Sequence, residues 1–279
     1  MAVMMTMRPN AGHRGFRNQR TGPSPSHIVK LDAFPGNTVY EVDERLIVKA
    51  STNHAALRAE AWACAQAADA GCAAPAILRF ARLDTGVNAL MMSRVPGRPI
   101  SAQDPAFDQV AANLRRLHGV TLSGFGWLSE GSLKHPSWPS FLKAICDNTR
   151  KLAPDVADAA ESAIDEHADT LGTNATGVLC HGDLKAAHIL VDDGRLAGVI
   201  DWGDALVADP WFDIARFAHR SPASSLVLLL DGYGATTEDW RLSLYQALWM
   251  LVDANVANRH GHNVDATLRG AMNYLKAAT

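Results

Sequence analysis

Two short apolar runs separated by a tight-turn sequence constrain this chain more than any other feature. The runs cover residues 189–191 and 196–200, and the letters Asp-Asp-Gly-Arg lie between them. Because glycine after aspartate supplies the positive φ that a hairpin turn needs, the two runs are predicted to pair as antiparallel strands. Pairing brings the outer ends of the hairpin together. His188 and Asp201 should therefore lie side by side, with Asp183 in the loop just before the first strand.

Three side chains able to bind protons or a metal thus converge at one point, and this arrangement is typical of phosphoryl transfer. A kinase does little covalent chemistry beyond aiming a hydroxyl and neutralising phosphate charge with magnesium. Asp183 is the predicted base. Asp201 is the predicted magnesium ligand, because a hard cation prefers carboxylate oxygens. A surface hairpin with solvated aspartates is the alternative for an isolated His-Gly-Asp triplet, but triplet, hairpin and Asp-Trp-Gly-Asp in this order favour the catalytic interpretation.

The segment from His181 to about Phe217 resembles the aminoglycoside phosphotransferase family, the antibiotic-kinase branch of the protein-kinase-like fold. The family pattern runs H-G-D-x-x-x-x-N, an apolar hairpin, I-D-W or I-D-F, G-D-P, and D-[apolar]-A. The corresponding letters here are His181-Gly182-Asp183, Ile200-Asp201-Trp202, Ala208-Asp209-Pro210 and Asp213-Ile214-Ala215. The resemblance implies that His181 holds the catalytic loop by hydrogen bonding. Asp209 and Asp213 are expected to cap the next helix and to tie the metal loop to it.

One position departs from the family pattern. His188 stands where an asparagine usually supplies a second metal ligand, and imidazole is a softer ligand than magnesium normally selects. Macrolide phosphotransferases also carry histidine at this position. We therefore expect His188 to be a working metal ligand, and a catalytically silent site is the alternative.

The resemblance implies an α+β fold with the two lobes of a protein kinase. The small N-lobe would be β-rich with one main helix, and the larger C-lobe would be mainly helical and carry the catalytic hairpin. A chain of 279 residues also exceeds the usual single domain, which independently favours two lobes. We expect a disordered tail over 1–26, a nucleotide-binding lobe over 27–95, and the hinge and helical lobe over 96–279.

Lys49 and Glu60 are the predicted ion pair of the N-lobe. Two β-rich runs at 37–42 and 45–49 form a second hairpin signal, and Lys49 ends the second run. Residues 53–70 show the composition of a helix, whose apolar stripe includes the position of Glu60. A buried carboxylate needs a cationic partner, and the resemblance assigns Lys49, which would contact the α- and β-phosphates. A surface salt bridge is the alternative for Glu60, and a solvated edge charge for Lys49.

The expected nucleotide contacts lie in a short loop and in a hinge. Backbone amides of Gly36, Asn37 and Thr38 can meet phosphate, although a plain turn explains the same letters. An apolar strand at 89–95 runs into Pro-Gly-Arg-Pro, which indicates a hinge. The resemblance places adenine against the backbone of this hinge, near Met92, Ser93 and Arg94. The methionines are equally explained as core residues.

Acceptor recognition is expected in the C-terminal helices at about 240–256 and 265–278. Asp204, Asp253, Asn255 and His260 lie in or near these helices. Acidic groups there would attract a polycationic antibiotic, whereas a solvated helix face is the alternative explanation.

Composition limits the partners. The net charge is −3, and lysine and arginine are scattered outside the N-terminal tail, which excludes a nucleic-acid groove. No apolar run is long enough to span a membrane. The four cysteines show no C-x-x-C spacing and resemble buried thiols of a reducing cytoplasm. We expect a cytoplasmic monomer or weak dimer.

The sequence therefore predicts a small-molecule O-kinase that uses ATP or GTP with Mg²⁺ and confers antibiotic resistance. Aminoglycosides, tuberactinomycins, macrolides and nucleoside antibiotics are the candidate acceptors. A metabolic kinase of the same fold, acting on choline, homoserine or a sugar, is the first alternative. A catalytically silent nucleotide-binding module is the second.

Overall fold

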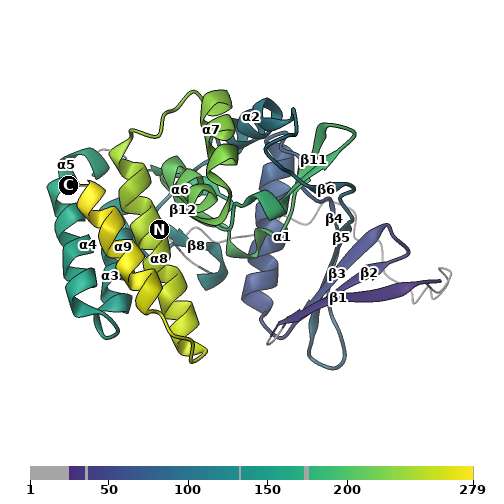
Figure 1. Ribbon diagram of the computed structural model, residues 1–279. Helices are drawn as coiled ribbons and strands as arrows, with labels where there is room; N and C mark the ends of the chain where they lie inside the picture. Colours follow the sequence, from purple (N-terminus) through teal and green to yellow (C-terminus); the bar gives the residue numbers. More distant parts are fainter. Residues whose placement is uncertain (1–24, 35–36, 132, 173–175, 279) are drawn as a thin grey trace.

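The computed structural model describes residues 25–34, 37–131, 133–172 and 176–278. A β-sheet lies at one side of the molecule and a larger helical part at the other (Figure 1). The expected disordered tail lies outside the described residues, except for residues 25 and 26.

The N-terminal part is a five-stranded antiparallel sheet with the order β1-β2-β3-β5-β4. Its strands are β1 (Ile28–Phe34), β2 (Asn37–Val42), β3 (Leu46–Ser51), β4 (Ile77–Arg82) and β5 (Asn88–Ser93). Asp43 and Glu44 turn β2 into β3 with φ values of 51° and 55°. Positive φ at both central residues is the geometry that suits the twist of a hairpin. The strand expected over 89–95 ends two residues early, at Ser93.

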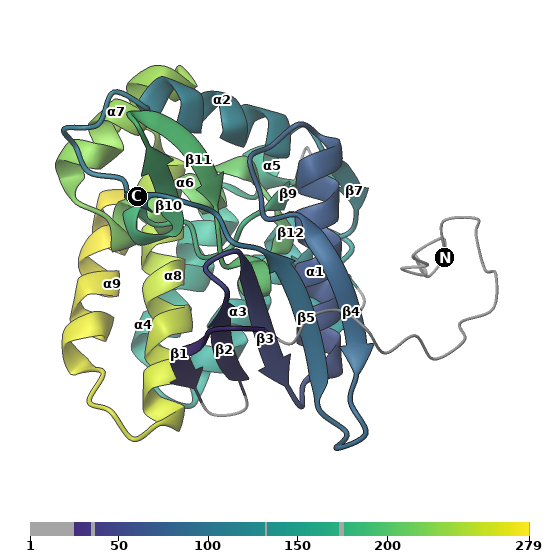
Figure 2. The ribbon, with the colours of Figure 1, turned by 90° about the vertical axis from the view of Figure 1, so that its right-hand side faces the viewer.

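Helix α1 (His54–Asp69) connects the sheet with the helical part (Figures 1 and 2). The Asn53 side chain accepts a hydrogen bond from the Ala56 amide at 3.1 Å, and Gly71, at φ +75°, follows the helix end. These are the predicted limits. Leu57 of α1 packs in a small cluster with Leu90 and Met92 of the sheet, so the apolar stripe of the helix faces β5.

The C-terminal part is mainly helical. Its helices are α2 (Phe107–Leu117), α3 (Trp138–Arg150), α4 (Pro154–Glu166), α5 (Ala168–Leu171), α6 (Pro210–Arg220), α7 (Ala223–Tyr233), α8 (Trp240–Arg259) and α9 (Asp265–Ala278). Aromatic side chains from α3, α6 and α8 fill its core. The Trp138 indole donates to the Tyr245 hydroxyl at 2.7 Å, and Trp249 donates to the Phe212 carbonyl at 2.8 Å. Among the described residues, no helix is both long and apolar enough to cross a membrane.

Two small sheets position the loops between the lobes. One has the order β11-β10-β6, from β6 (Arg98–Pro99), β10 (Ile189–Asp192) and β11 (Arg195–Val199). The other has the order β7-β9-β12-β8, from β7 (Thr121–Ser123), β8 (Gly126–Trp127), β9 (Thr176–Cys180) and β12 (Leu206–Ala208). Because β9 and β12 are antiparallel, the loop after β9 lies next to the segment before β12.

Candidate active site

The open end of the β10–β11 hairpin gathers three side chains, as the turn sequence predicted. Asp193 and Gly194 form the turn with φ values of 46° and 72°. At the other end, ligand atoms of Asp183, His188 and Asp201 all lie within 4.8 Å of one another. They come from the loop after β9, from the short 3-10 helix η2 (Ala186–His188), and from the residue just before the 3-10 helix η3 (Trp202–Asp204). A loop, a helix end and a strand end thus meet in one cluster.

Asp201 is held ionised at the entrance to the cluster. Its backbone adopts a left-handed conformation with φ 67° and ψ 66°, which aspartate tolerates better than most side chains. Lys49 donates to its Oδ1 at 2.7 Å. Desolvation opposes the charged form, yet the Lys49 ammonium outweighs it and holds the pKa of Asp201 at about 2. Half of the Asp201 side chain stays exposed, so its free oxygen remains open to a ligand.

His188 presents a nitrogen lone pair to the same point. Its Nδ1 lies 3.0 Å from the Asp183 backbone carbonyl, which only accepts hydrogen bonds, so Nδ1 carries the proton. Its Nε2 then faces Asp201 Oδ2 at 3.5 Å with a lone pair. Burial lowers the pKa of His188 to about 4, so the ring is neutral near pH 7. Two acceptors facing each other fit a divalent cation between them.

Lys49 forms the predicted ion pair with Glu60 and a second ion pair with Asp201. Its Nζ lies 2.5 Å from Glu60 Oε1 and 2.7 Å from Asp201 Oδ1. The Glu60 side chain is only 4% exposed, which excludes the surface salt bridge. Burial disfavours the ammonium, but the two carboxylates outweigh burial and raise the pKa of Lys49 above its ordinary value. Lys49 on β3 therefore links the N-terminal sheet and α1 to the hairpin of the C-terminal part.

His181 holds the catalytic loop, as expected. Its Nε2 faces the Ile200 carbonyl at 3.0 Å and therefore carries the proton, while its Nδ1 accepts from the Asp183 amide at 3.2 Å. The loop is thereby fastened to the end of β11. Gly182 between them has φ +80°, and a Cβ there would lie 1.9 Å from the Asp204 carbonyl oxygen. Glycine is required at this position because both the conformation and the space exclude a side chain.

The role predicted for Asp213 needs a correction. Its carboxylate accepts from the backbone amides of His181 and Gly182 at 2.7 and 2.8 Å. Asp213 therefore fastens the loop that carries His181 and Asp183, not the segment that carries Asp201, because α6 packs against β9. Asp209 caps α6 as predicted, accepting from the Trp211 amide at 2.8 Å.

Asp183 has two cationic partners, and neither pairing was predicted from the sequence. Lys185 Nζ lies 2.7 Å from Asp183 Oδ2, and Arg216 lies 3.0 Å from Asp183 Oδ1. Arg216 also donates to Asp253 Oδ1 at 2.9 Å. A signal was present: Arg216 follows Asp213 by three residues and therefore shares its helix face, where an unpaired charge would be costly.

The backbone amides of the predicted hinge residues Ser93 and Arg94 already donate hydrogen bonds to protein carbonyls. Met92 is a core residue, 4% exposed. The Ser93 amide donates to the Ala76 carbonyl at 2.9 Å, and the Arg94 amide donates to the Arg45 carbonyl at 2.8 Å. An adenine contact through either amide would therefore have to replace an existing hydrogen bond.

The predicted nucleotide loop is described only in part. Gly36 lies outside the described residues. Asn37 and Thr38 begin β2 and pair with residues of β1 and β3, so they belong to the sheet. Their contact with phosphate stays a prediction.

The predicted acceptor residues do not gather into one acidic pocket. Asp253 faces Arg216, His219 and Arg220, which offset its charge. The Asn255 amide points to α3 and donates to Thr149 Oγ1 at 2.7 Å. This orientation arises because α8 packs against α3, a contact that a helix-face pattern alone does not specify.

Of the other two residues predicted to bind the acceptor, His260 lies at the end of α8 and Asp204 lies near the Asp183 cluster. His260 is the exposed C-cap of α8. Asp204 lies close to the cluster: desolvation and the carboxylates of Asp183 and Asp201 raise its pKa, although part of its side chain stays exposed.

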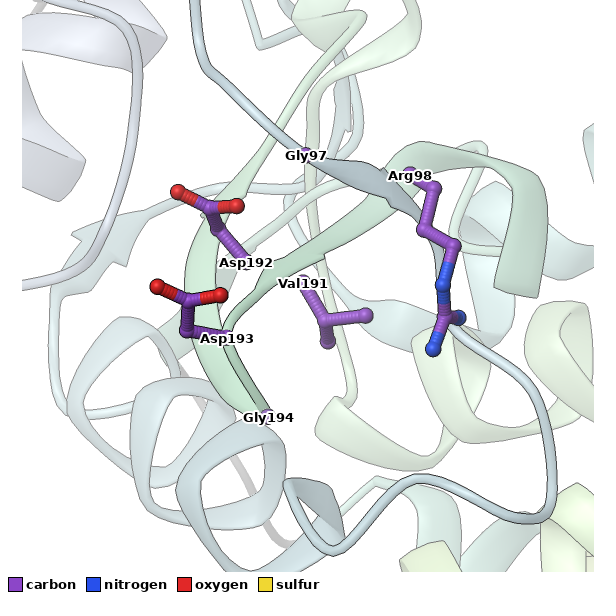
Figure 3. A pocket seen from close by; sticks show the side chains of 6 residues that line it. All are labelled: Gly97, Arg98, Val191, Asp192, Asp193 and Gly194. Carbon is purple, nitrogen blue, oxygen red and sulfur yellow. The ribbon is translucent and has the colours of Figure 1, made fainter.

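A separate hollow of about 400 Å³ lies at the closed end of the hairpin (Figure 3). It is lined by Gly97, Arg98, Val191, Asp192, Asp193 and Gly194. The approach of β6 to β10 requires glycine at 97, since a Cβ there would lie 2.2 Å from the Val191 carbonyl oxygen. The hollow and the Asp183 cluster lie at opposite ends of strand β10, which has four residues and extends by roughly 3.3 Å per residue. The hollow is therefore separate from the cluster.

Comparison with known proteins agrees with this geometry. The chain is 24% identical over 188 residues to viomycin phosphotransferase of Streptomyces vinaceus, a match that covers 62% of this chain and 64% of that protein. It is 27% identical over 107 residues to hygromycin-B 4-O-kinase of Escherichia coli, covering 36% of this chain and 31% of that protein. The chain thus spans less than two thirds of the curated relatives it matches.

The fold is shared more widely than the sequence. A thermostable mutant of the aminoglycoside phosphotransferase APH(4)-Ia, solved with ADP and hygromycin B, superposes with a TM-score of 0.74 over 91% of this chain and 95% of that chain, at 16% identity. This likeness confirms the predicted α+β, bilobal protein-kinase-like fold. Residues 33–244 match the sequence profile of the phosphotransferase enzyme family. Since that match covers most of the chain and includes the whole Asp183 cluster, the chain belongs to the phosphotransferase enzyme family.

Proposed function

We propose that this protein transfers the γ-phosphate of ATP or GTP to a hydroxyl group of an antibiotic and so confers resistance. The observation that carries the proposal is the cluster of Asp183, His188 and Asp201 within 4.8 Å, joined by Lys49 to buried Glu60. The relatives named for viomycin and hygromycin B support an antibiotic as acceptor. Solved structures with ADP, AMP-PNP or GDP support a nucleotide as donor.

Each residue of the cluster has a part in the transfer. Asp183 accepts the proton of the acceptor hydroxyl as its oxygen forms a bond to the γ-phosphorus and the bond to the β–γ bridging oxygen breaks. Asp201 and His188 would hold Mg²⁺, and the bound ion would supply charge neutralisation at the phosphates. Lys49 directs its ammonium toward the α- and β-phosphates, and Glu60 fixes the position of that ammonium. Lys185, which pairs with Asp183 at 2.7 Å, would contact the γ-phosphate.

Several finer assignments belong to the same proposal. Adenine would lie against the backbone near Met92, Ser93 and Arg94, with phosphate near Gly36, Asn37 and Thr38. The lobes would divide at residue 95. We propose a cytoplasmic protein that acts as a monomer or weak dimer. Among the acceptor candidates, Asp204 keeps its place because it lies beside the cluster.

A mass-spectrometric screen tests the function directly. The purified protein is incubated with Mg²⁺ and ATP or GTP and with viomycin, hygromycin B, kanamycin, a macrolide, choline and homoserine. We expect one added phosphate on an antibiotic, and none with the Asp183→Ala variant. Phosphate on choline or homoserine alone would replace the proposal with a metabolic kinase. Nucleotide binding without turnover on any compound or on water would identify a silent module.

A further inference from the structure

Helix α6 holds three successive residues of the catalytic loop. Asp213 accepts from the backbone amides of His181 and Gly182, and Arg216 donates to the side chain of Asp183. Asp213 and Arg216 are three residues apart and therefore share one face of the helix. The helix thus fixes both the backbone of the loop and the carboxylate that the loop presents.

Arg216 is buried and is held by contacts with an aromatic ring and two carboxylates. Its side chain is 7% exposed, and its guanidinium lies 4.4 Å from the centroid of the Trp249 ring. Its Nε donates to Asp183 Oδ1 at 3.1 Å, its Nη2 lies 3.0 Å from the same oxygen, and its Nη1 donates to Asp253 Oδ1 at 2.9 Å. A planar guanidinium can bind two carboxylates and stack at once, which an ammonium cannot do.

This geometry distinguishes the two oxygens of Asp183. Oδ1 accepts one hydrogen bond from Arg216 and forms an ion pair with its guanidinium, whereas Oδ2 faces Lys185 at 2.7 Å and His188 at 3.5 Å. Oδ2 is therefore the oxygen on the side of the proposed metal and phosphate. Fixing Oδ1 sets the direction in which Oδ2 points.

We propose that Arg216 is a positioning residue that selects Oδ2 of Asp183 as the proton-accepting oxygen and couples it, through Asp253, to helix α8. This inference rests on the proposed function. The contacts of Arg216 are with Asp183, Asp253 and Trp249, so it would act through the base. Its effect is on the orientation of the base, so it should act on turnover and leave nucleotide binding unchanged.

The test compares Arg216→Lys with a matched control. Arg241 also forms two hydrogen bonds to one carboxylate and lies 4.9 Å from the centroid of a tryptophan ring, that of Trp211. Its two hydrogen bonds go to Asp239, however, and not to Asp183. The assay measures phosphate transfer from Mg-ATP to viomycin, and to water as the second acceptor. Rates are expressed per folded molecule, with the folded fraction taken from near-UV circular dichroism.

We expect Arg216→Lys to lower kcat about 100-fold with the Michaelis constant for ATP unchanged, as a base displaced by about 1 Å would. Arg241→Lys should lower the melting temperature and leave kcat unchanged. Should Arg216→Lys fail to fold, Asp253→Asn is measured instead, and it should lower kcat about 10-fold because Arg216 keeps Asp183 but loses its second anchor.

The outcomes separate the inference from the proposed function. An active wild type whose Arg216→Lys and Asp253→Asn variants turn over normally would overturn the positioning role alone. A drop in kcat that Arg241→Lys shares would assign the effect to general stability and also overturn it. A wild type that transfers phosphate to neither viomycin, the other antibiotics nor water would overturn the proposed function, and the role of Arg216 with it.

Discussion

Removing the Lys49 ammonium should destabilise this protein far more than removing a surface lysine with a similar pairing distance. Lys49 lies 2.5 Å from Glu60, whose side chain is 4% exposed. The Lys49→Met variant would leave that carboxylate in a nearly dry site. Breaking a buried pair from one side typically costs about 3–5 kcal/mol, because the remaining charge is uncompensated. That cost is a large part of the stability of a folded protein.

Lys143 provides the matched control. Its Nζ lies 2.6 Å from Asp165, but the two side chains are 37% and 57% exposed. Lys143→Met should therefore cost at most about 1 kcal/mol, the usual range of exposed pairs. The double variant Lys49→Met with Glu60→Leu should recover most of the loss, because replacing both members of a buried pair with apolar groups is often close to neutral.

Urea unfolding at fixed pH and salt provides the measurement. Tryptophan fluorescence and far-UV circular dichroism are followed together, and coincident transitions allow the free energy of unfolding to be extrapolated. Equal losses in Lys49→Met and Lys143→Met would refute the reasoning. A double variant as unstable as Lys49→Met would do so too, since it would show that the lost ammonium, not the stranded carboxylate, causes the effect.

Three further predictions follow from local geometry. Gly182→Ala should lower the free energy of unfolding by more than about 2 kcal/mol, because its Cβ would meet a backbone oxygen at 1.9 Å. Gly86→Ala, at φ +82° with open space around it, should lower it by about 1 kcal/mol. Equal losses in thermal unfolding would contradict this reasoning. His188→Asn should weaken Ni²⁺ binding more than Mg²⁺ binding, both measured by isothermal titration calorimetry, because imidazole suits Ni²⁺ whereas Mg²⁺ prefers oxygen ligands. An equal effect on both ions would argue against His188 as a ligand. Burial opposes ionisation of Asp253, but His219 and Arg216 hold its pKa at about 2, below the ordinary 3.8, so its stabilisation, on the order of 2 kcal/mol, is present above about pH 4 and is lost as the pH falls toward 2. The stability gap between wild type and Asp253→Asn should accordingly shrink from pH 6 to pH 3, and a constant gap would disprove the assignment.

The parts of the site that follow from local sequence were predictable. The Asp-Gly turn determines the pairing of β10 with β11, and that pairing alone brings His188 next to Asp201. The apolar stripe of α1 places Glu60 on its buried face, and burial of a carboxylate then requires a cation such as Lys49. In both cases a short-range pattern and one physical cost were sufficient.

The parts that depend on packing between distant segments were not predictable in the same way. Arg216 and Asp253 lie 37 residues apart on α6 and α8, and nothing in either helix specifies that the two will meet. The orientation of Asn255 toward α3 likewise depends on which neighbour α8 packs against. Strands β7 and β8 form within a Gly- and Ser-rich stretch because β9 and β12 provide partners, not because of their own β-propensity.

Binding of Mg²⁺ and the non-hydrolysable nucleotide AMP-PNP, measured by isothermal titration calorimetry, tests the central claim most directly. If Asp183 is the base and Asp201 holds the cation, Asp183→Ala should bind the magnesium nucleotide as tightly as wild type, whereas Asp201→Ala should bind it much more weakly. Equal loss of binding in both variants, or full binding in both, would contradict the division of roles between these two carboxylates.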